Sequence, residues 1–400
     1  MIVGDSPTYW IGLDDTDERE FGCTTHDFND LLNHLTSNGY TIEDPRLVRL
    51  WPFAPRRTRG NAALAASIST RDRSSLVESL DDWFTTRFSS LQPGTDTHSA
   101  QPVLILSSKK LPESIYWNTV RKYVELEDRV SELVSYPHHI WSTPAGMGGL
   151  IGASAAIAWQ GENDFTWECT AWRNGTGQRQ IPVNLVKEMS QQFPSTFLNR
   201  DPTAGRSLIA PRTPCPVLYG IRGESKQDVL DAHIYLQKNG AEVSVDHRVH
   251  RSNQATDDHL QDSVIGMVKN IRVMQGGHVE IDTGQKLLAF SQGGDINKLS
   301  QELIEGDKIQ WLGLEHNDGS FHLERIRLVD GQRNRTRPIC SCGRRYKSQG
   351  KNQSLKCPNC GSKHADFWCT DNVDSDWKEP PASHRRHLAK PLSRIGKSEI

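Results

Sequence analysis

The sequence predicts a multidomain α+β protein that ends in a small metal-binding module. Its 400 residues exceed the length of one ordinary domain, so about two to four domains are expected. Up to residue 260, strand-type apolar runs alternate with segments of helical spacing, whereas from Ser263 short strands follow one another between turn signals. Five of the eight cysteines lie between Cys340 and Cys369, at a spacing that suits metal ligands better than disulfides.

Composition indicates a protein that works in water. The mean hydropathy is −0.60. The longest apolar stretch, residues 150–159, is far shorter than the roughly 20 residues that cross a bilayer. The N-terminal "MIVGDSPTYWIGLDD" lacks the charged and apolar regions of a signal peptide. We therefore expect a cytoplasmic protein.

The formal net charge of −2 is unevenly distributed. Residues 331–370 carry nine Lys or Arg against one acid, Asp366, which makes this segment +8 and the remaining 360 residues −10. A basic segment on a mildly acidic body indicates a polyanionic partner. A solvated run of charges is the alternative explanation.

The N-terminal elements are expected in the order strand, polar loop, helix. "TYWIGL", residues 8–13, has the composition of a strand and leads into the acidic loop "DDTD". The helix that follows should end near Gly39, and its apolar face is formed by Phe28, Leu31, Leu32 and Leu35. Further strands are expected in "RLVRLWPF", "AALAASIS" and "QPVLIL".

The central part of the chain indicates a small α+β layer. The apolar segment "GMGGLIGASAAIAW" is followed by "DFTWECTAWR", which alternates enough to be a strand. "CPVLYGIRGES", "KQDVLDAHIYLQKNG" and "AEVSVDHRV" then predict strand, helix and strand. In this helix we expect Leu230, Ile234 and Leu236 on the apolar face and Gly240 as the C-cap.

From Ser263 the chain has the pattern of a β-barrel. The short strands lie in "VIGMVKNIRVM", "GGHVEIDTG", "QKLLAFSQ" and "GDKIQWLGLEHNDGSFHLERIRLV". About 65 residues of this kind suit a five-stranded oligonucleotide-binding (OB) barrel, which offers a strand face and loops to single-stranded nucleic acid. A barrel that serves only as a spacer is the alternative.

The C-terminal cysteines predict a zinc ribbon. Two pairs are separated by 14 residues, and their members are Cys340, Cys342, Cys357 and Cys360. Two such hooks joined by a hairpin can close a tetrahedron round zinc, whose affinity would supply the folding energy of so small a module. The first hook has one residue between its cysteines instead of two, so His364 or Cys369 could substitute as a ligand. A disulfide or free thiols are the alternatives.

The hairpin between the two hooks is basic. We expect it to bind RNA phosphates and a stacked base through Arg344, Arg345, Tyr346, Lys347 and Lys351. A merely solvated hairpin is the alternative.

The acidic loop predicts a metal–nucleotide site. Asp14, Asp15 and Asp17 follow a strand, and carboxylates there can hold Mg²⁺ that bridges nucleotide phosphates. The helix that begins near Thr24 directs its free N–H groups at the same space, which favours a phosphate. Thr24 or Thr25 could instead be an N-cap, and the aspartates a solvated turn. A calcium loop is disfavoured, since no EF-hand spacing follows.

A second polar segment, "RRTRGNAA", supplies the cationic half of such a site. Arg59, Gly60 and Asn61 combine a forked cation with a flexible backbone, which suits a polyphosphate. A basic turn by itself is usually only surface. Together with the acidic loop, it completes a candidate nucleotide site.

These motifs resemble a known family. "IGLDDTD…GCTT", "RLVRL…P…TRGN", "GLIGASAAI", "DFTWECTAWR", "PVLYGIRGES" and "SNQATDDH" stand in the family's order and are followed by a barrel and a basic zinc ribbon. From about residue 10 to 362, the chain closely resembles the archaeal tRNA-isoleucine 2-agmatinylcytidine synthetases. It departs from their pattern at Trp51, Ala62 and Ala255 and in the shortened first hook.

The resemblance implies a domain order. An ATP-dependent kinase-like catalytic domain would occupy residues 1–142, and a ferredoxin-like domain 143–260. An OB-fold RNA-binding domain would follow at 261–330 and a zinc ribbon at 331–370. Residues 371–400 mix Pro, Ser, His and charges without periodicity and are expected to be disordered.

The resemblance also implies an activity and its partners. The family is a carbon–nitrogen ligase that joins agmatine to the wobble cytidine of the CAU-anticodon isoleucine tRNA, so that AUA is decoded. ATP is split to AMP and pyrophosphate, and phosphorylation of the ring carbonyl oxygen turns it into a leaving group. The expected cofactors are ATP, Mg²⁺ and Zn²⁺. Because the base must leave its stack, the barrel and ribbon should hold the anticodon stem.

The family's site residues map onto positions of this sequence. The catalytic residues would be Thr24, which the family phosphorylates, and the Mg²⁺ and ATP carboxylates Asp14, Asp15 and Asp17. Agmatine is a double cation, so its pocket should contain acids. The candidates in matching segments are Asp164, Glu168, Asp201 and Asp257, although each could be a strand-end or turn carboxylate.

Two other functions remain as alternatives. A Mg²⁺-dependent kinase for a small molecule would need only the acidic loop, but it leaves the barrel and the +8 segment unexplained. A non-catalytic RNA-binding protein would need only the barrel and ribbon, but it leaves "DDTD" and "TRGN" without a role.

Overall fold

The computed structural model describes residues 6–18, 22–58, 60–91, 99–162, 164–175, 177–351, 353–366 and 368–395. The chain divides into two compact units. The first unit contains Met1–Leu260 and Ala382–Ile400, and the second contains Gln261–Pro381.

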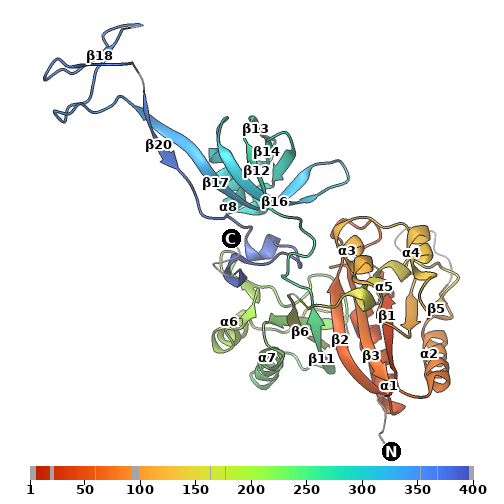
Figure 1. Cartoon of the computed structure of the whole chain (residues 1–400). Coiled ribbons are helices and arrows are strands. Elements are labelled where there is room, and N and C mark those ends of the chain that lie inside the picture. The colour runs from red at the N-terminus through yellow and green to blue at the C-terminus, as the bar shows by residue number, and fades with distance from the viewer. Residues whose placement is uncertain are drawn as a thin grey trace, which may run out of the picture. The chain divides into compact units, whose positions relative to one another are not determined.

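The first unit is built on one nine-stranded sheet with the order β5-β4-β1-β3-β2-β11-β6-β10-β7 (Figure 1). Neighbouring strands are antiparallel except β2 and β11, whose parallel pairing joins the two halves of the sheet. The strands are β1 (Thr8–Asp14), β2 (Thr41–Arg49), β3 (Ala62–Ser69), β4 (Val103–Ser107), β5 (His138–Ser142), β6 (Thr166–Trp172), β7 (Thr196–Phe197), β10 (Val217–Gly223) and β11 (Asp246–Ser252). A separate pair is formed by β8 (Arg200–Asp201) and β9 (Arg206–Ser207).

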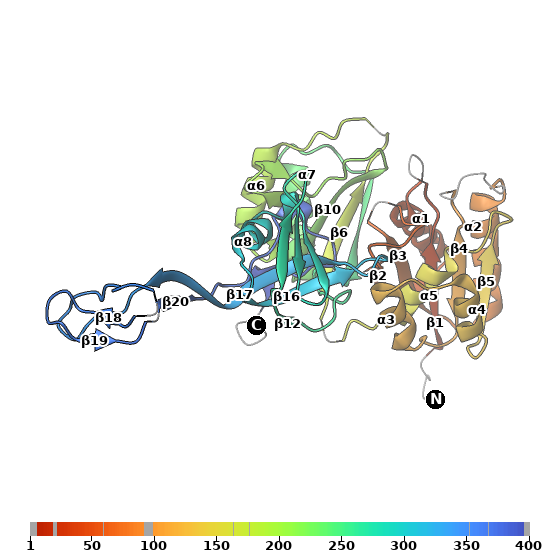
Figure 2. The ribbon, with the colours of Figure 1, turned by 90° about the horizontal axis from the view of Figure 1, so that it is seen from above.

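Helices cover both faces of the N-terminal half of this sheet (Figure 2). Trp10 of β1 packs with α3 (Glu113–Arg121), α4 (Leu126–Leu133) and α5 (Leu150–Ala158). Ile11 and Leu13 pack with α1 (Thr24–Ser37) and α2 (Arg73–Phe88) on the other face. Alternate residues of a strand point to opposite faces, so a strand covered on both sides is apolar almost throughout. The predicted N-terminal helix and the three strands after it are confirmed.

The C-terminal half of the sheet carries α6 (Val183–Gln192) and α7 (Lys226–Lys238) over a separate core. The predicted apolar face of α7 is wrong in part. Leu236 is buried, but Ile234 is 37% exposed, and the helix instead buries Val229 and Ala232. Val229, Ala232 and Leu236 have the i, i+3, i+7 spacing of one helical face, whereas Ile234 stands only two residues before Leu236 and therefore points to another side of the helix.

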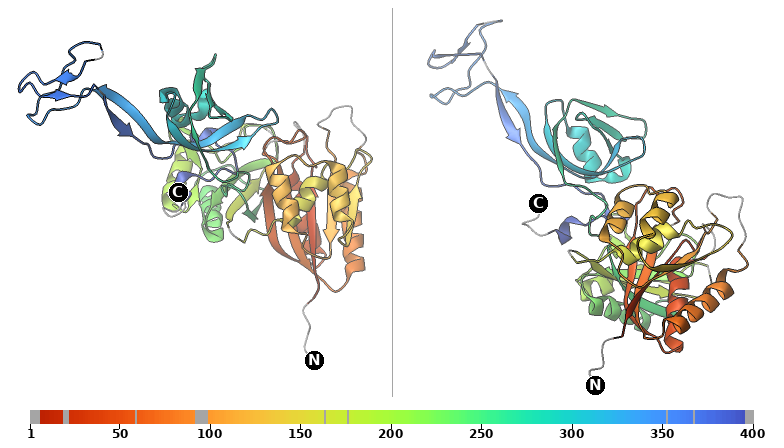
Figure 3. Two further views of the ribbon diagram at one scale, coloured as in Figure 1. Left: turned by 45° about the horizontal axis from the view of Figure 1, so that its top comes forward. Right: turned by 45° about the vertical axis from the view of Figure 1, so that its right-hand side comes forward.

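The second unit contains a half-barrel sheet with the order β12-β16-β17-β15-β14-β13. Its strands are β12 (Val264–Met267), β13 (Asn270–Val273), β14 (Val279–Asp282), β15 (Lys286–Ala289), β16 (Lys308–Glu315) and β17 (Phe321–Thr336). A 3-10 turn η1 (Ser291–Gly293) and α8 (Asp295–Glu302) connect β15 to β16. β17 runs on beyond this sheet and pairs with β20 (Cys369–Val373), as Figure 3 shows. The short pair β18 (Leu355–Lys356) and β19 (Lys363–His364) belongs to the cysteine-rich segment.

The expected disorder of residues 371–400 is wrong for the part that the structure describes. β20 pairs with β17 through Gly331 and Val373, and two 3-10 turns follow, η2 (Ala382–His384) and η3 (Leu392–Arg394). Residues 382–395 dock on the first unit through backbone hydrogen bonds and ion pairs, which leave no periodic apolar pattern in the sequence. Residues 396–400 lie outside the described residues. In the described part of the chain, no helix has both the length and the apolarity to cross a membrane.

Candidate functional site

The acidic loop is held between the end of β1 and the start of α1. Asp15 adopts a left-handed backbone conformation with φ of 57°, which an aspartate tolerates better than most residues. Thr16 Oγ1 donates a hydrogen bond of 2.6 Å to Asp27 Oδ2 on α1. Asp27 also pairs with Arg87 of α2 at 2.5 Å. These contacts fix the loop on α1 and α2, so its other carboxylates keep a defined direction.

Helix α5 presses against the same carboxylates. A Cβ at Gly152 would lie 1.8 Å from Asp14 Oδ2, and one at Gly149 would lie 2.5 Å from Asp14 O. One at Gly12 would lie 2.3 Å from Ala153 O. Glycine at these positions lets α5 approach β1 closely. The glycines of "GMGGLIG" are therefore part of the site, since they bring the start of α5 to Asp14.

Burial raises the pKa of two aspartates of the loop. It raises the pKa of Asp14 well above its ordinary value, and the charges of Asp15 and Asp17 add to this effect. Burial also raises the pKa of Asp15 to about 7, although Arg56, with Nη2 3.3 Å from Oδ2, opposes the shift. Buried carboxylates near one another hold protons unless a cation neutralises them. The loop is thus a place where a cation would be favoured.

Asp17 connects the loop to the first turn of α1. Its Oδ1 accepts hydrogen bonds of 3.0 Å from Thr24 Oγ1 and from Thr58 Oγ1. Cys23 occupies the N-cap position of α1, and Thr25 Oγ1 lies 3.2 Å from Trp172 Nε1. The N-cap alternative for the two threonines is therefore wrong. The hydroxyl of Thr24 instead faces a buried carboxylate.

Two cavities meet at Asp17. The first, of about 320 Å³, is lined by all three aspartates of the loop, by Trp51 and Ala54 to Thr58, and by Lys122 to Glu127. The second, of about 510 Å³, is lined by Thr24 and the start of α1, by Arg49 and Glu168, and by the segment from Ser207 to Thr213. Asp17, Thr58, Asn61 and Ala62 line both cavities. Their volumes suit small-molecule ligands.

The "TRGN" segment forms part of the wall between the cavities. Asn61 has a left-handed conformation with φ of 46°, and its Nδ2 donates 2.9 Å to Trp51 O. Gly60 is needed for close approach, because a Cβ there would lie 2.3 Å from Arg49 Nη1 and 3.0 Å from the ring of His387. Arg59, the third predicted residue of this segment, lies outside the described residues.

Of the four predicted agmatine carboxylates, Glu168 is a described lining residue of the second cavity. It lies 3.9 Å from Arg49 and 3.5 Å from Arg222, and it accepts hydrogen bonds from Thr170 and Gln254. Burial would raise the pKa of Glu168, but the two guanidinium groups outweigh burial and lower it. Glu168 is therefore charged and already shared by two cations.

The other three candidate acids have partners within the protein. Asp164 pairs with Arg394 at 2.7 Å and with Lys390 at 3.2 Å. Asp201 accepts from Thr203 N at 2.9 Å and from Ser383 N at 3.1 Å. Asp257 accepts from Lys390 N at 2.7 Å. Neither cavity has these three carboxylates among its described lining residues, and their partners come largely from the C-terminal segment.

Four lining residues of the second cavity are not predicted as site residues from the sequence, and they are Arg49, Thr58, Arg222 and His387. The first three stand inside the family-like motifs "RLVRL", "TRGN" and "GIRGES", which mark their segments but not their individual roles. His387 comes from the segment expected to be disordered, and nothing in its local sequence marks it.

The four predicted zinc ligands converge. The Sγ atoms of Cys340 and Cys360 are 3.5 Å apart and those of Cys342 and Cys357 are 3.4 Å apart, and all four lie within 4.8 Å of one another. A tetrahedral zinc with Zn–S bonds of about 2.3 Å requires sulfurs about 3.8 Å apart, so the set fits zinc despite the short first hook. His364 and Cys369 are not part of this cluster.

Tyr346 does not have the expected role. It is only 7% exposed, packs with Leu355 in the core of the ribbon, and contacts Ser362 Oγ at 3.0 Å. In so small a module the aromatic ring is needed as core. The hairpin cations, by contrast, are exposed, and they are Arg344, Arg345, Lys347 and Lys351.

Comparisons with known proteins agree with this architecture. The chain matches three domain families: the TiaS TCKD domain over residues 10–144, the TiaS FLD domain over 148–259 and the TiaS C-terminal zinc ribbon domain over 337–367. It is 30% identical to the tRNA(Ile2) 2-agmatinylcytidine synthetase TiaS of Methanocorpusculum labreanum, covering 96% of each chain. It is also 30% identical to that of Archaeoglobus fulgidus, covering 96% of this chain and 97% of the other.

Solved structures show the same similarity. The structure of a TiaS–tRNA(Ile2)–ATP complex matches with a TM-score of 0.79 and 28% identity, covering 98% of this chain and 99% of the other. That of a TiaS–tRNA(Ile2)–AMPCPP–agmatine complex matches with a TM-score of 0.77 and 25% identity, covering 98% of each chain.

Proposed function

Because this chain belongs to the tRNA(Ile2) 2-agmatinylcytidine synthetase family, we propose that it joins agmatine to the wobble cytidine of the CAU-anticodon isoleucine tRNA. ATP is split to AMP and two phosphates: the γ-phosphoryl group passes to the C2 oxygen of the base and departs as phosphate when agmatine adds, and the β-phosphate is released by water. The observation that carries this proposal is the meeting of two cavities at Asp17, which accepts a hydrogen bond from Thr24. One cavity suits a nucleotide with a cation, and the other suits the base.

The chemistry requires two adjoining sites. A cytosine carbonyl is a poor electrophile because oxide is a prohibitively bad leaving group, whereas a phosphorylated oxygen departs as phosphate. Enzymes stabilise a transferred phosphoryl group mainly by position and charge. ATP in the first cavity would direct its phosphates toward Asp17, and the base in the second would present its oxygen to the same point. The amine of agmatine then displaces the phosphate.

Thr24 is the proposed phosphoryl carrier. Its hydroxyl lies in the first turn of α1, where backbone N–H groups favour an anion, and it donates to Asp17 Oδ1 at 3.0 Å. Asp17 is placed to accept the proton as the hydroxyl attacks phosphorus. Asp14 and Asp15 would hold Mg²⁺ with the phosphates, because one or two carboxylates suffice when substrate oxygens complete the shell. Bound Mg²⁺ would neutralise charge on the phosphates.

Arg49 and Arg222 suit the activated base. Glu168 carries one negative charge between two guanidinium groups, so this part of the second cavity has a positive excess. Such a surface favours a phosphorylated base over the cationic agmatine. We therefore assign Glu168 to the positioning of the two arginines.

Topology supports the family's domain names. β6-α6-β7-β10-α7-β11 has the βαββαβ order, with strand order β11-β6-β10-β7, of a ferredoxin-like layer. We assign the N-terminal half to the kinase-like domain and the half-barrel of the second unit to the OB fold. The half-barrel and the hairpin cations would hold the tRNA.

The test is mass spectrometry of nuclease-digested isoleucine tRNA after incubation with ATP, Mg²⁺, agmatine and the protein. We expect a cytidine enlarged by agmatine minus water, and AMP in the supernatant. Omission of agmatine is the control. ATP consumption that needs neither tRNA nor agmatine, without a modified base, would refute the proposal in favour of a small-molecule kinase. tRNA binding without any ATP turnover would instead identify an RNA-binding protein.

A further inference from the structure

Residues 382–395, named here the C-terminal strap, return from the second unit to the first. Ala255 N donates to His387 O at 2.9 Å, and Asp257 N donates to Leu388 O at 2.9 Å. The side chain of Leu388 is 1% exposed and belongs to the core around α5. The strap is therefore a built part of the first unit.

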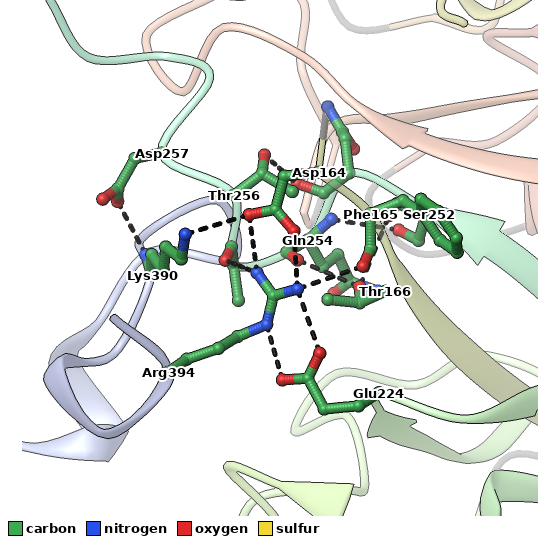
Figure 4. A network of polar contacts seen from close by, with 12 residues as sticks. Asp164, Phe165, Thr166, Glu224, Ser252, Gln254, Thr256, Asp257, Lys390 and Arg394 are labelled. Atoms are coloured by element: carbon green, nitrogen blue, oxygen red, sulfur yellow. Dashed lines mark hydrogen bonds and ion pairs between the residues drawn. The ribbon is translucent and has the colours of Figure 1, made fainter. Parts of the chain in front are cut away.

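Arg394 is the anchor of the strap (Figure 4). Its guanidinium donates to both oxygens of Asp164, at 2.7 and 2.9 Å, and to both oxygens of Glu224, at 2.6 and 3.0 Å. It also donates to Ala255 O at 2.7 Å and Phe165 O at 3.0 Å. Bidentate pairs of this kind fix geometry as well as supply energy.

Two of the three segments that Arg394 joins lead into the second cavity, and the third leads to a residue that binds Glu168. Asp164 and Phe165 precede β6, which carries Glu168. Glu224 follows β10, which carries Arg222, and Ala255 follows Gln254. One guanidinium thus joins the ends of β6 and β10, which carry Glu168 and Arg222, to the turn after β11.

The turn that the strap contacts is strained. Ala255 and Asp257 have φ of 58° and 65°, in the left-handed region. An alanine keeps a left-handed backbone conformation only where surrounding contacts hold it there. The backbone hydrogen bonds from Ala255 N and Asp257 N to the strap provide such constraints.

His387 brings the strap to the cavity wall. It lines the second cavity, and its Nδ1 lies 3.2 Å from Gln254 Oε1. The amide of Gln254 in turn donates to Glu168. The other edge of the ring covers Gly60, where a Cβ would come within 3.0 Å of Nε2. The charge of Arg49 and burial hold the pKa of His387 well below its usual range, so the ring is neutral and can donate one hydrogen bond from Nδ1.

We propose that the C-terminal strap is a positioning element of the active site, in which Arg394 anchors the strand ends and His387 orients Gln254, Glu168 and the Gly60 loop. This inference rests on the proposed function. The strap contacts the second cavity, so it serves transfer to the base and not the splitting of ATP in the first cavity.

The test compares His387→Ala with His387→Asn, which keeps an N–H near the position of Nδ1. His384→Ala is the matched control, because His384 is an exposed histidine of the same strap. We expect His387→Ala to lower agmatinylcytidine formation at least about tenfold, since small misplacements cost much in rate, while the AMP formed in the first turnover stays within about twofold. Later turnovers of ATP should slow with the product, because Thr24 must pass on its phosphoryl group first. His387→Asn should recover to within about threefold of the parent protein. His384→Ala should match the parent.

Two outcomes overturn the proposal. One is an unchanged rate of modification in His387→Ala. The other is an equal fall of first-turnover AMP and of modified base, which indicates lost folding instead of lost positioning. Hydrogen exchange gives a readout that is independent of activity: Arg394→Ala should speed exchange at residues 253–257, and unchanged exchange there contradicts the anchoring role. If the parent protein itself forms no modified base, the proposed function is refuted. The hydrogen-exchange result still shows whether Arg394 anchors residues 253–257.

Discussion

Asp15 should make the ligand-free protein less stable as pH rises. Burial raises the pKa of this carboxyl from 3.8 to about 7 in the folded state. Between about pH 4 and 7 the folded state keeps the proton that the unfolded state has lost, so the free energy of unfolding falls through this window. The difference sets a ceiling of about 4 kcal/mol, because each tenfold change in proton affinity is worth about 1.36 kcal/mol.

The perturbation that isolates this effect is Asp15→Asn, which keeps the shape of the side chain and removes its charge. Relaxation of the loop around the charge reduces the ceiling, and we expect a gain of about 1–2 kcal/mol at pH 8, or about 2–8 °C in Tm. The gain should shrink at pH 5. The control is Asp82→Asn, an exposed acid of α2.

Thermal denaturation at pH 5 and pH 8, with and without Mg²⁺ and ATP, is the assay. With both ligands the parent protein should gain stability and Asp15→Asn should gain less, because Mg²⁺ requires the carboxylate. A Tm difference that is the same at both pH values would refute the electrostatic reasoning. So would a variant that is less stable than the parent at pH 8 without ligands.

Three further predictions concern other parts of the chain. Thr24→Ala should remove at least about 99% of product formation, measured by mass spectrometry, because the phosphoryl carrier is lost. The affinity for tRNA, measured by filter binding, should stay unchanged. Full activity would exclude Thr24 as the phosphoryl carrier. Replacing all four hairpin cations by alanine should weaken the salt dependence of tRNA binding. The slope of the logarithm of the tRNA association constant against the logarithm of the salt concentration should flatten by about 0.7–0.9 for each lost phosphate contact. An unchanged slope would show that these cations do not contact the tRNA phosphates. Gly152→Ala should cost about 1–3 kcal/mol in chemical denaturation, because its Cβ would overlap Asp14, while Gly177→Ala, whose nearest neighbour would be 3.9 Å away, should cost less.

Patterns of neighbouring residues were sufficient to predict features that lie within one short segment of the chain. The acidic loop, the face of α1 and the four cysteines were predicted from spacing, because strand alternation, helical period and ligand spacing are properties of neighbouring residues. The four thiols converge as expected, and α1 begins at the predicted threonine. The catalytic roles of the loop aspartates and of Thr24 stay predictions.

Sequence patterns did not predict the role of a residue where that role depends on a partner far along the chain. Tyr346 beside four cations suggests a base-stacking platform, yet the small ribbon needs its ring as core. Asp164 resembles a free acid in the sequence, but its cation, Arg394, lies 230 residues away. The same holds for the strap, whose contacts are made by backbone groups and ion pairs and leave no periodic signal.

The sequence by itself determined the elements, the ligand set and the family, since each is written in residues that stand close together or in a fixed order. Only the tertiary structure decided which charges are neutralised and which face a cavity. The physical reason is that an ion pair or a cavity wall forms between side chains brought together by packing, and chain distance carries little information about such contacts.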